Sequence, residues 1–388
     1  MNRQLINKKV KSTFVASIIR RMFKYDLKPF YFFILTSIII LSSCETEVEL
    51  LAPYEETPVI YGILDYTADT QFVRINKTFL GEGEPSQYSA IKDSVEYEEG
   101  DVSATIVKFN EEGNEVASFP LQIIDRPSRD PGIFYDEDVR FYFTDAELFT
   151  QDDLDQVLFN PSDFSFELRV DIQGEQYAAT TVFPGISEST ITFPNDINGE
   201  PARLAFAFGT QTLMFTSVNL RFLSDNSTET YSGLLRMNFD YVTVEDELVE
   251  NQFIDFNLGE FQNDESGAPF NAVVQGENYY TFLKSELDMI PGLKEVQIFN
   301  LETIIIGAPP ELSTYIDVAQ PVSEFSPTFS TFTNFDNGAI GLFSSRGSET
   351  RIALLDNKSV QMLNENSITN EYDFCTQGWT GSSFLCVP

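Results

Sequence analysis

Short segments in which apolar and polar residues alternate recur along this chain from Pro58 onward, and they narrow the range of folds open to it. Residues 71–76 alternate in this way, which is the pattern of a strand with one buried and one solvated face. Residues 102–109 repeat the pattern and stop at a polar turn over residues 110–114. Several short strands separated by turns are typical of a β-sandwich. The sequence therefore predicts a mainly β fold.

The same pattern predicts two β-sandwich-like domains. Phe183-Pro184-Gly185 marks the boundary between an N-terminal, immunoglobulin-like β-sandwich over residues 58–184 and a C-terminal β-rich domain over residues 185–365. Apolar residues follow helical spacing over residues 279–290, so we expect a few short helices in the second domain. Residues 366–388 are expected to form a separate tail.

The N-terminal region has the features of a secretory signal segment, assigned to residues 1–43. A twelve-residue apolar run over residues 30–41 follows basic residues, and it is shorter than the ~20 apolar residues of a membrane span. The run ends in Leu41-Ser42-Ser43-Cys44, which resembles the lipobox of bacterial lipoproteins. That resemblance implies cleavage before Cys44 and lipid attachment to Cys44, so that a lipid anchor would hold the protein on a membrane.

A signal segment of 43 residues is long for its class. Translation from Met22 would give a segment of ordinary length and would leave residues 1–21 untranslated. Residues 44–57 are expected to be a lipidated tether. Glu45, Glu47 and Glu49 in this tether resemble the acidic export signal of surface lipoproteins in Bacteroidota, which implies display on the outer face of the outer membrane. The alternative is a short solvated tether in an acidic protein.

The charge of the chain bears on its partners. Residues 1–43 hold eight Lys or Arg and one acidic residue, so the remainder carries 16 basic and 59 acidic residues, a net charge of −43. Such a surface repels phosphate backbones, which excludes nucleic acid as a partner. The 36 Phe and 16 Tyr argue against disorder, because that much aromatic surface can fill a core. We interpret the acidity as a solvated exterior.

The chain contains no histidine. This excludes Ser-His-Asp and Cys-His catalysis and argues against most zinc and iron sites. An enzyme built from these residues would rely on carboxylates, as glycoside hydrolases do. Since 60 acidic residues make chance carboxylate pairs abundant, composition alone does not support that chemistry. We therefore predict a protein that is not an enzyme and has no cofactor.

The C-terminal tail holds Cys375 and Cys386 in a Gly- and Ser-rich context. Two cysteines in an exported protein suggest a small disulfide loop. The single tryptophan, Trp379, lies inside this loop, where its ring could be displayed for stacking on a sugar. The alternative is that Trp379 packs the tail onto the rest of the fold.

One turn offers weak candidates for a calcium site. Asn334, Asp336 and Asn337 supply oxygens before Gly338, and Ca²⁺ prefers oxygen ligands. The spacing of an EF-hand loop is absent, so an ordinary turn is the simpler interpretation.

Two stretches of the chain carry a family resemblance. Pro58-Val59-Ile60-Tyr61-Gly62-Ile63-Leu64, continued by residues 72–81, resembles the start of uncharacterised Bacteroidota lipoproteins with a domain of unknown function. Residues 331–338 and 341–346 resemble their closing block. The resemblance implies a β-rich cell-envelope lipoprotein, sometimes encoded beside outer-membrane transporters, and it carries over no catalytic residue.

These inferences together predict a lipid-anchored lipoprotein of the outer membrane, facing the cell exterior, that acts as a binding or scaffolding module. Its expected partners are an outer-membrane transporter or a surface glycan. The competing hypothesis is a carboxylate-dependent glycan hydrolase, for which a cleft with two carboxyl groups ~5–10 Å apart would be the sign.

Overall fold

The computed structural model describes most of the 388-residue chain. The described residues are 56–79, 85–126, 135, 138–154, 159–196, 198–263, 268–319, 332–379 and 381–386. The described residues, all from Glu56 onward, belong to one compact unit. The predicted signal segment, Cys44, and the acidic residues Glu45, Glu47 and Glu49 therefore lie outside the described residues. In the part of the chain that is described, no helix is both long and apolar enough to cross a membrane.

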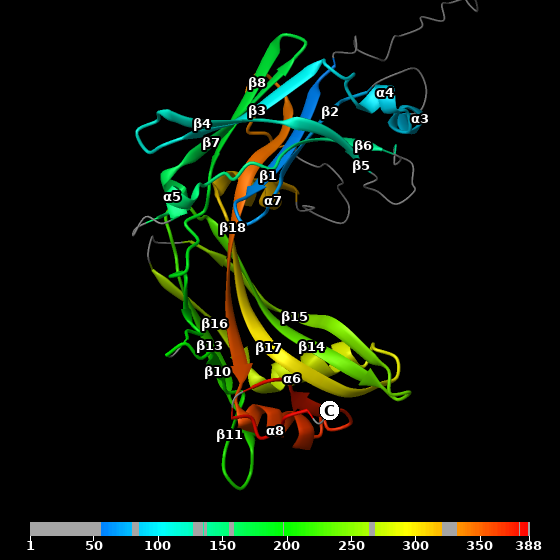
Figure 1. Cartoon of the computed structure of the whole chain (residues 1–388), viewed down its shortest axis with the longest axis vertical. Coiled ribbons are helices and arrows are strands. Elements are labelled where there is room, and N and C mark those ends of the chain that lie inside the picture. Colours follow the sequence, from blue (N-terminus) through cyan, green and yellow to red (C-terminus); the bar gives the residue numbers. More distant parts are fainter. Residues whose placement is uncertain are drawn as a thin grey trace, which may run out of the picture. The chain divides into compact units, whose positions relative to one another are not determined.

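A ten-stranded sheet organises the fold (Figure 1). Its main path runs in the order β15-β14-β17-β18-β1-β2-β6-β5, while β10 also pairs with β18 and β19 with β17. These strands are β1 (Pro58–Asp65), β2 (Gln71–Lys77), β5 (Gln122–Arg126), β6 (Val139–Thr144), β10 (Ala202–Leu204), β14 (Thr230–Thr243), β15 (Leu248–Gln262), β17 (Leu293–Ala308), β18 (Ile340–Leu355) and β19 (Asp373–Thr376).

The first sandwich packs one end of this sheet against a second sheet. The second sheet has the strand order β4-β3-β7-β8. Its strands are β3 (Val102–Phe109), β4 (Glu115–Pro120), β7 (Ser165–Ile172) and β8 (Glu175–Val182). The alternation of β3 and β7 turns Ile106 and Leu168 inward, where they join Ile60 of β1 in one apolar core. Short helical segments lie beside this sandwich: α3 (Pro85–Ser89), α4 (Lys92–Val95), α5 (Gln151–Leu154) and η1 (Pro161–Asp163).

The second sandwich packs the other end of the long sheet against three strands and two helices. The strands β9 (Ile191–Phe193), β13 (Ser217–Leu223) and β16 (Pro269–Gln275) form a sheet in the order β16-β13-β9. Helix α6 (Gly276–Leu287) buries Tyr279, Leu283 and Leu287, which are spaced to share one face. Helix α8 (Asn357–Glu365) begins after Asp356, whose side chain accepts a hydrogen bond from the Ser359 N–H. A hairpin of β11 (Ala207–Phe208) and β12 (Met214–Phe215) and helix α7 (Pro310–Ala319) complete the described elements.

Strand β18 belongs to both sandwiches. Its residues 340–346 pair in parallel with β1, and its residues 347–353 pair in antiparallel with β17. Phe335 and Ala339 before the strand, and Phe343 within it, are buried in the first core. Part of the segment 185–365, which the sequence analysis assigns to the C-terminal domain, therefore completes the N-terminal core.

The chain passes from the first core to the second between Phe183 and Ile186. Ile186 packs where Gly307 of β17 lies opposite Gly347 of β18. A Cβ atom at Gly307 would lie 2.9 Å from Cδ1 of Ile186, so only glycine leaves room for that side chain at this point.

The prediction of a mainly β fold with two β-sandwich-like halves and few helices is confirmed. Helix α6 falls where helical spacing predicts one. Helix α5 lies within residues 145–158, where the sequence favours a helical turn or two, whereas α8, α3, α4 and the length of β17 and β18 were not predicted from the sequence.

Candidate functional site

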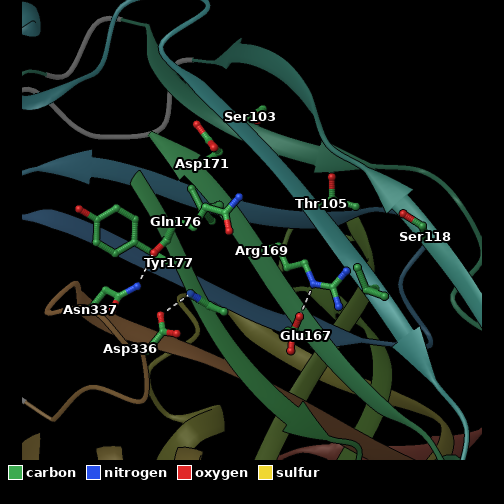
Figure 2. A pocket seen from close by; sticks show the side chains of 13 residues that line it. Ser103, Thr105, Ser118, Glu167, Arg169, Asp171, Gln176, Tyr177, Asp336 and Asn337 are labelled. Carbon is green, nitrogen blue, oxygen red and sulfur yellow. Dashed lines mark hydrogen bonds and ion pairs between the residues drawn. The ribbon is translucent and has the colours of Figure 1, made fainter. Parts of the chain in front are cut away.

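The outer face of the four-stranded sheet forms a polar recess of about 420 Å³ (Figure 2). Strand alternation builds it, because Ala104, Ile106 and Leu168 point into the core while their neighbours point to solvent. The side chains that face the recess from the strands include Ser103, Thr105, Ser118, Glu167, Arg169, Asp171 and Gln176. The recess thus lies on a rigid sheet whose opposite face is buried.

Arg169 holds the positive charge of the recess. Its guanidinium is ion-paired with Glu167 and lies 3.3 Å from a carboxylate oxygen of Glu115. The hydrogen bond to Glu167 raises the pKa of the Arg169 side chain above its ordinary value. Its Cζ atom also lies 5.6 Å from the centre of the Phe109 ring, which helps to fix the side chain. Arg169 is therefore a half-exposed cation whose guanidinium is fixed between two carboxylates.

Several polar groups of the recess are not used by the protein. Among the described residues, the hydroxyls of Ser103, Thr105 and Ser118 and the side-chain amide of Gln176 have no hydrogen-bond partner. Hydroxyl and amide groups both donate and accept hydrogen bonds, and such groups close to carboxylates and an arginine suit a ligand rich in hydroxyls. The recess can therefore bind a polar, uncharged molecule through hydrogen bonds.

One wall of the recess comes from the turn that precedes β18. The Asp336 N–H donates to the Ala178 carbonyl at 3.0 Å, and Asp336 Oδ1 accepts from the Ala178 N–H at 2.7 Å. Asn337 Nδ2 donates to the Gln176 carbonyl at 2.7 Å. These contacts cover the free edge of β8. The turn therefore fixes the edge of the recess.

This geometry does not support the calcium prediction. Asn334 Oδ1 accepts from the Phe343 N–H at 3.0 Å. Asp336 Oδ1 accepts from the N–H of Ala178, which lies on a different strand. Asn337 directs its amide nitrogen, not its oxygen, at the carbonyl of Gln176. The three side chains hold the turn against two strands, which is the simpler interpretation given above.

No protein-family model matches this chain. No curated protein matches it either. Among solved structures, the chain is similar to the C-terminal domain of the AgI/II polypeptide BspA of Streptococcus agalactiae, at 10% identity over 65% of this chain and 95% of that domain. The TM-score is 0.12, so this likeness carries no argument about fold or function. The site must be interpreted from its own chemistry.

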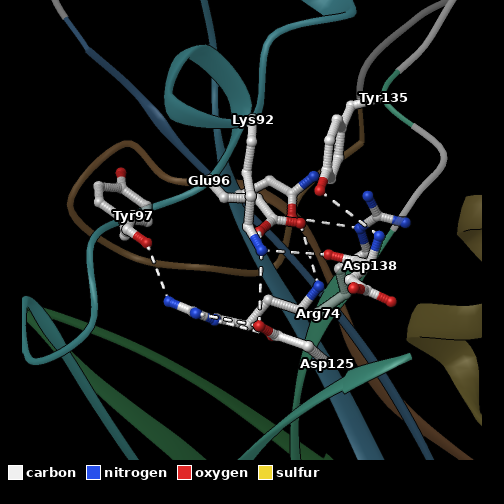
Figure 3. Close-up of polar contacts among 9 residues, drawn as sticks. Arg74, Lys92, Glu96, Tyr97, Asp125, Tyr135 and Asp138 are labelled. Carbon is white, nitrogen blue, oxygen red and sulfur yellow. Dashed lines mark hydrogen bonds and ion pairs between the residues drawn. The ribbon is translucent and has the colours of Figure 1, made fainter. Parts of the chain in front are cut away.

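A second polar cluster lies where α4 meets β5 and β6 (Figure 3). Arg140 binds both carboxylate oxygens of Asp125, at 3.0 and 3.2 Å. Lys92 lies 3.5 Å from Asp125 and 3.7 Å from the buried Glu96. Hydrogen bonds from Arg140 hold the pKa of Asp125 below its ordinary value. Since the cations and carboxylates of this cluster neutralise one another, we interpret it as a structural link.

The structure joins Cys375 and Cys386 by a disulfide with Sγ atoms 2.10 Å apart. Trp379, between them, is only 5% exposed, and its Nε1–H donates to the carbonyl of Phe299. Its ring is not displayed, so the suggestion that it stacks on a sugar is wrong and the packing alternative holds. Glu295 lies close to both sulfurs, but disulfide sulfurs are not the thiolates that bind metal ions.

Lys108 is a buried cation that the sequence analysis missed. It is 3% exposed, its Nζ lies 2.8 Å from Asp153, and Nζ lies 4.2 and 4.5 Å from the centres of the Phe164 and Phe149 rings. Burial alone would raise the pKa of Asp153, but hydrogen bonds from Lys108 and Thr150 lower it overall. The alternation of residues 102–109 indicates this burial, because Lys108 shares the inward face of the strand with Ile106.

Proposed function

We propose that this chain is a lipid-anchored lipoprotein of the bacterial outer membrane that binds a surface glycan in the recess of its four-stranded sheet. The observation that carries the glycan part is the set of unused groups on Ser103, Thr105, Ser118 and Gln176 beside Arg169. Saccharides present closely spaced hydroxyls, and each needs a protein donor or acceptor when it leaves water. The recess lies on the outer face of a sheet, which suits a segment of an extended polymer.

The anchor part rests on Leu41-Ser42-Ser43-Cys44 and on Glu45, Glu47 and Glu49, which resemble a lipobox followed by a surface-export signal. A protein held on the outer face in this way would meet extracellular polymers first. The resemblance to Bacteroidota lipoproteins also supports a role beside an outer-membrane transporter, to which the module would deliver its glycan.

Glycan binding is tested by titration calorimetry of the purified lipoprotein with neutral oligosaccharides, for example maltohexaose, xylohexaose and laminarihexaose. Thr105→Val with Ser118→Ala removes two hydroxyls of the recess with little change in volume. We expect at least one oligosaccharide to bind and the double variant to weaken it roughly tenfold, since two hydrogen bonds are lost. Thr212→Val with Ser217→Ala, exposed on the second sandwich, is the matched control. No binding by any neutral oligosaccharide contradicts this part.

The anchor is tested in the native host by mass spectrometry and protease treatment of intact cells, comparing the wild type with Cys44→Ala. A lipidated protein that protease removes from intact cells supports the outer-face location. A lipidated protein that resists protease contradicts the export role of Glu45, Glu47 and Glu49. A wild type without lipid contradicts the anchor itself.

The alternative of a glycan hydrolase is favoured by one observation. Glu349 lies in a cavity of about 760 Å³ that Glu188 also lines, and burial raises the pKa of Glu349, as a general acid requires. Glu349 is, however, 3.3 Å from Arg351, which stabilises its charged form. Release of reducing sugar by the wild type, lost in Glu349→Gln, would establish the enzyme in place of the binding module.

A further inference from the structure

A second cavity, of about 440 Å³, lies between helix α7 and the ten-stranded sheet. Its walls are largely apolar and include Ile63 of β1, Phe72 of β2, and Leu312 and Ile316 of α7. Ile63 and Ile316 are 46% and 42% exposed, so two large apolar side chains remain in contact with solvent here. The volume lies within the ~300–1,000 Å³ of small-molecule sites.

Two contacts hold α7 in place above the sheet. Ser313 Oγ lies 2.6 Å from Thr230 Oγ of β14, and Ser313 is buried. The Tyr315 ring packs edge-on against Tyr61 of β1, with ring centres 6.1 Å apart. Because α7 is tied to two strands of one sheet, the cavity beneath it is formed before any ligand arrives, as is usual for ligand sites.

Among the described residues that line the cavity, acidic side chains outnumber basic ones. Arg346 is ion-paired with Asp65 at 2.8 Å, so these two groups cancel. Glu260 of β15 and Asp317 of α7 also line the cavity, both are exposed, and neither has an ion-pair partner among the described residues. The apolar walls therefore carry two uncompensated carboxylates, on opposite elements.

We propose that this cavity binds a cation with an apolar body, that is, an amine or guanidinium at the end of a hydrocarbon or aromatic group. The apolar part would cover Ile63, Phe72 and Ile316, and the cation would lie between Glu260 and Asp317. A free amine and a Lys or Arg side chain of a peptide present the same chemistry. This site is distinct from the glycan recess and does not depend on it.

The test uses three probes with one apolar body: 4-phenylbutylamine, 4-phenylbutanol and 4-phenylbutyrate. Each is titrated by calorimetry into the full chain carrying Cys44→Ala, which prevents lipid attachment. The amine is expected to bind roughly three- to thirtyfold more tightly than the alcohol, the range that two partly exposed charge pairs supply, and the carboxylate most weakly. The blocked tripeptide acetyl-Phe-Lys-Phe-amide separates the sources: tighter binding than the free amine identifies a peptide ligand, and weaker binding identifies a small amine.

Two variants locate the site. Glu260→Gln with Asp317→Asn is expected to bring the affinity of the amine down to that of the alcohol, while Ile316→Ser weakens both. Glu112→Gln with Glu245→Gln changes the net charge equally at exposed positions and should leave binding unchanged. Equal binding of the amine and the alcohol by the starting protein overturns the proposal. Absence of amine binding overturns it as well. So does a preference for the amine that survives in Glu260→Gln with Asp317→Asn.

Discussion

Gly307 of β17 and Gly347 of β18 lie opposite each other, and the side chain of Ile186 packs against both. Cβ atoms built at these glycines would approach Ile186 to 2.9 and 3.1 Å. Because these two glycines have no side chain, they leave the space that Ile186 fills where the chain crosses from one core to the other.

Gly307→Val should destabilise the protein by about 1–3 kcal/mol, because the added atoms overlap Ile186 in a packed site. Urea unfolding measures this cost. The same substitution in an Ile186→Ala background should cost less, because truncation of Ile186 frees the space. Equal costs in the two backgrounds would show that Ile186 is not the obstacle.

The Asp65–Arg346 pair should give the protein an acid-dependent stability. Burial would raise the pKa of Asp65, but hydrogen bonds from Thr67 and Arg346 outweigh it and lower this pKa overall. An acid whose pKa is lower in the folded state stabilises above its unfolded pKa of ~3.9, and the stability is lost as pH falls through the folded pKa. Asp65→Asn should therefore reduce stability at pH 6 and flatten its decline below pH 4. Asp246→Asn, at a fully exposed pair, is the control.

Lys108→Met keeps the length of the buried side chain but removes its charge. We expect a loss of about 1–3 kcal/mol, because Asp153 loses its partner and the cation–aromatic contacts disappear. Adding Asp153→Asn should recover part of the loss. The measurement is again urea unfolding, and a double variant as unstable as the sum of the singles would argue against direct coupling.

Trp379→Ala should cost about 3–5 kcal/mol, as for a large core side chain, and should leave unchanged the glycan affinity that we propose for the recess. Trp379→Phe should cost less, since it retains one aromatic ring, although it loses the hydrogen bond to the Phe299 carbonyl and part of the buried ring volume. Thermal unfolding and calorimetric titration measure the two effects. A stable Trp379→Ala variant that had lost glycan binding would restore Trp379 as a ligand contact.

Alternation predicted a strand over residues 102–109, in which Ser103 and Thr105 lie on the face opposite Ile106, but it did not single out these residues or Arg169 as a site. It could not show that Asp336 would close that surface, since Asp336 and Ala178 are 158 residues apart and nothing local links them. Local pattern also gave no sign that β18 would pair with β1 and β17 in succession. Trp379 was ambiguous for a similar reason: its exposure depends on β17, far earlier in the chain.

Strand β18, shared by both cores, bears on the order in which the protein can acquire its structure. Residues 58–184 leave the ribosome well before residues 335–343, so their core lacks Phe335, Ala339 and Phe343 until almost the whole chain has been made. The early segment would therefore stay incomplete throughout synthesis and close only when its last strand arrives. For the export across a membrane that we propose, such late closure would keep the chain competent for transport until translocation is nearly finished.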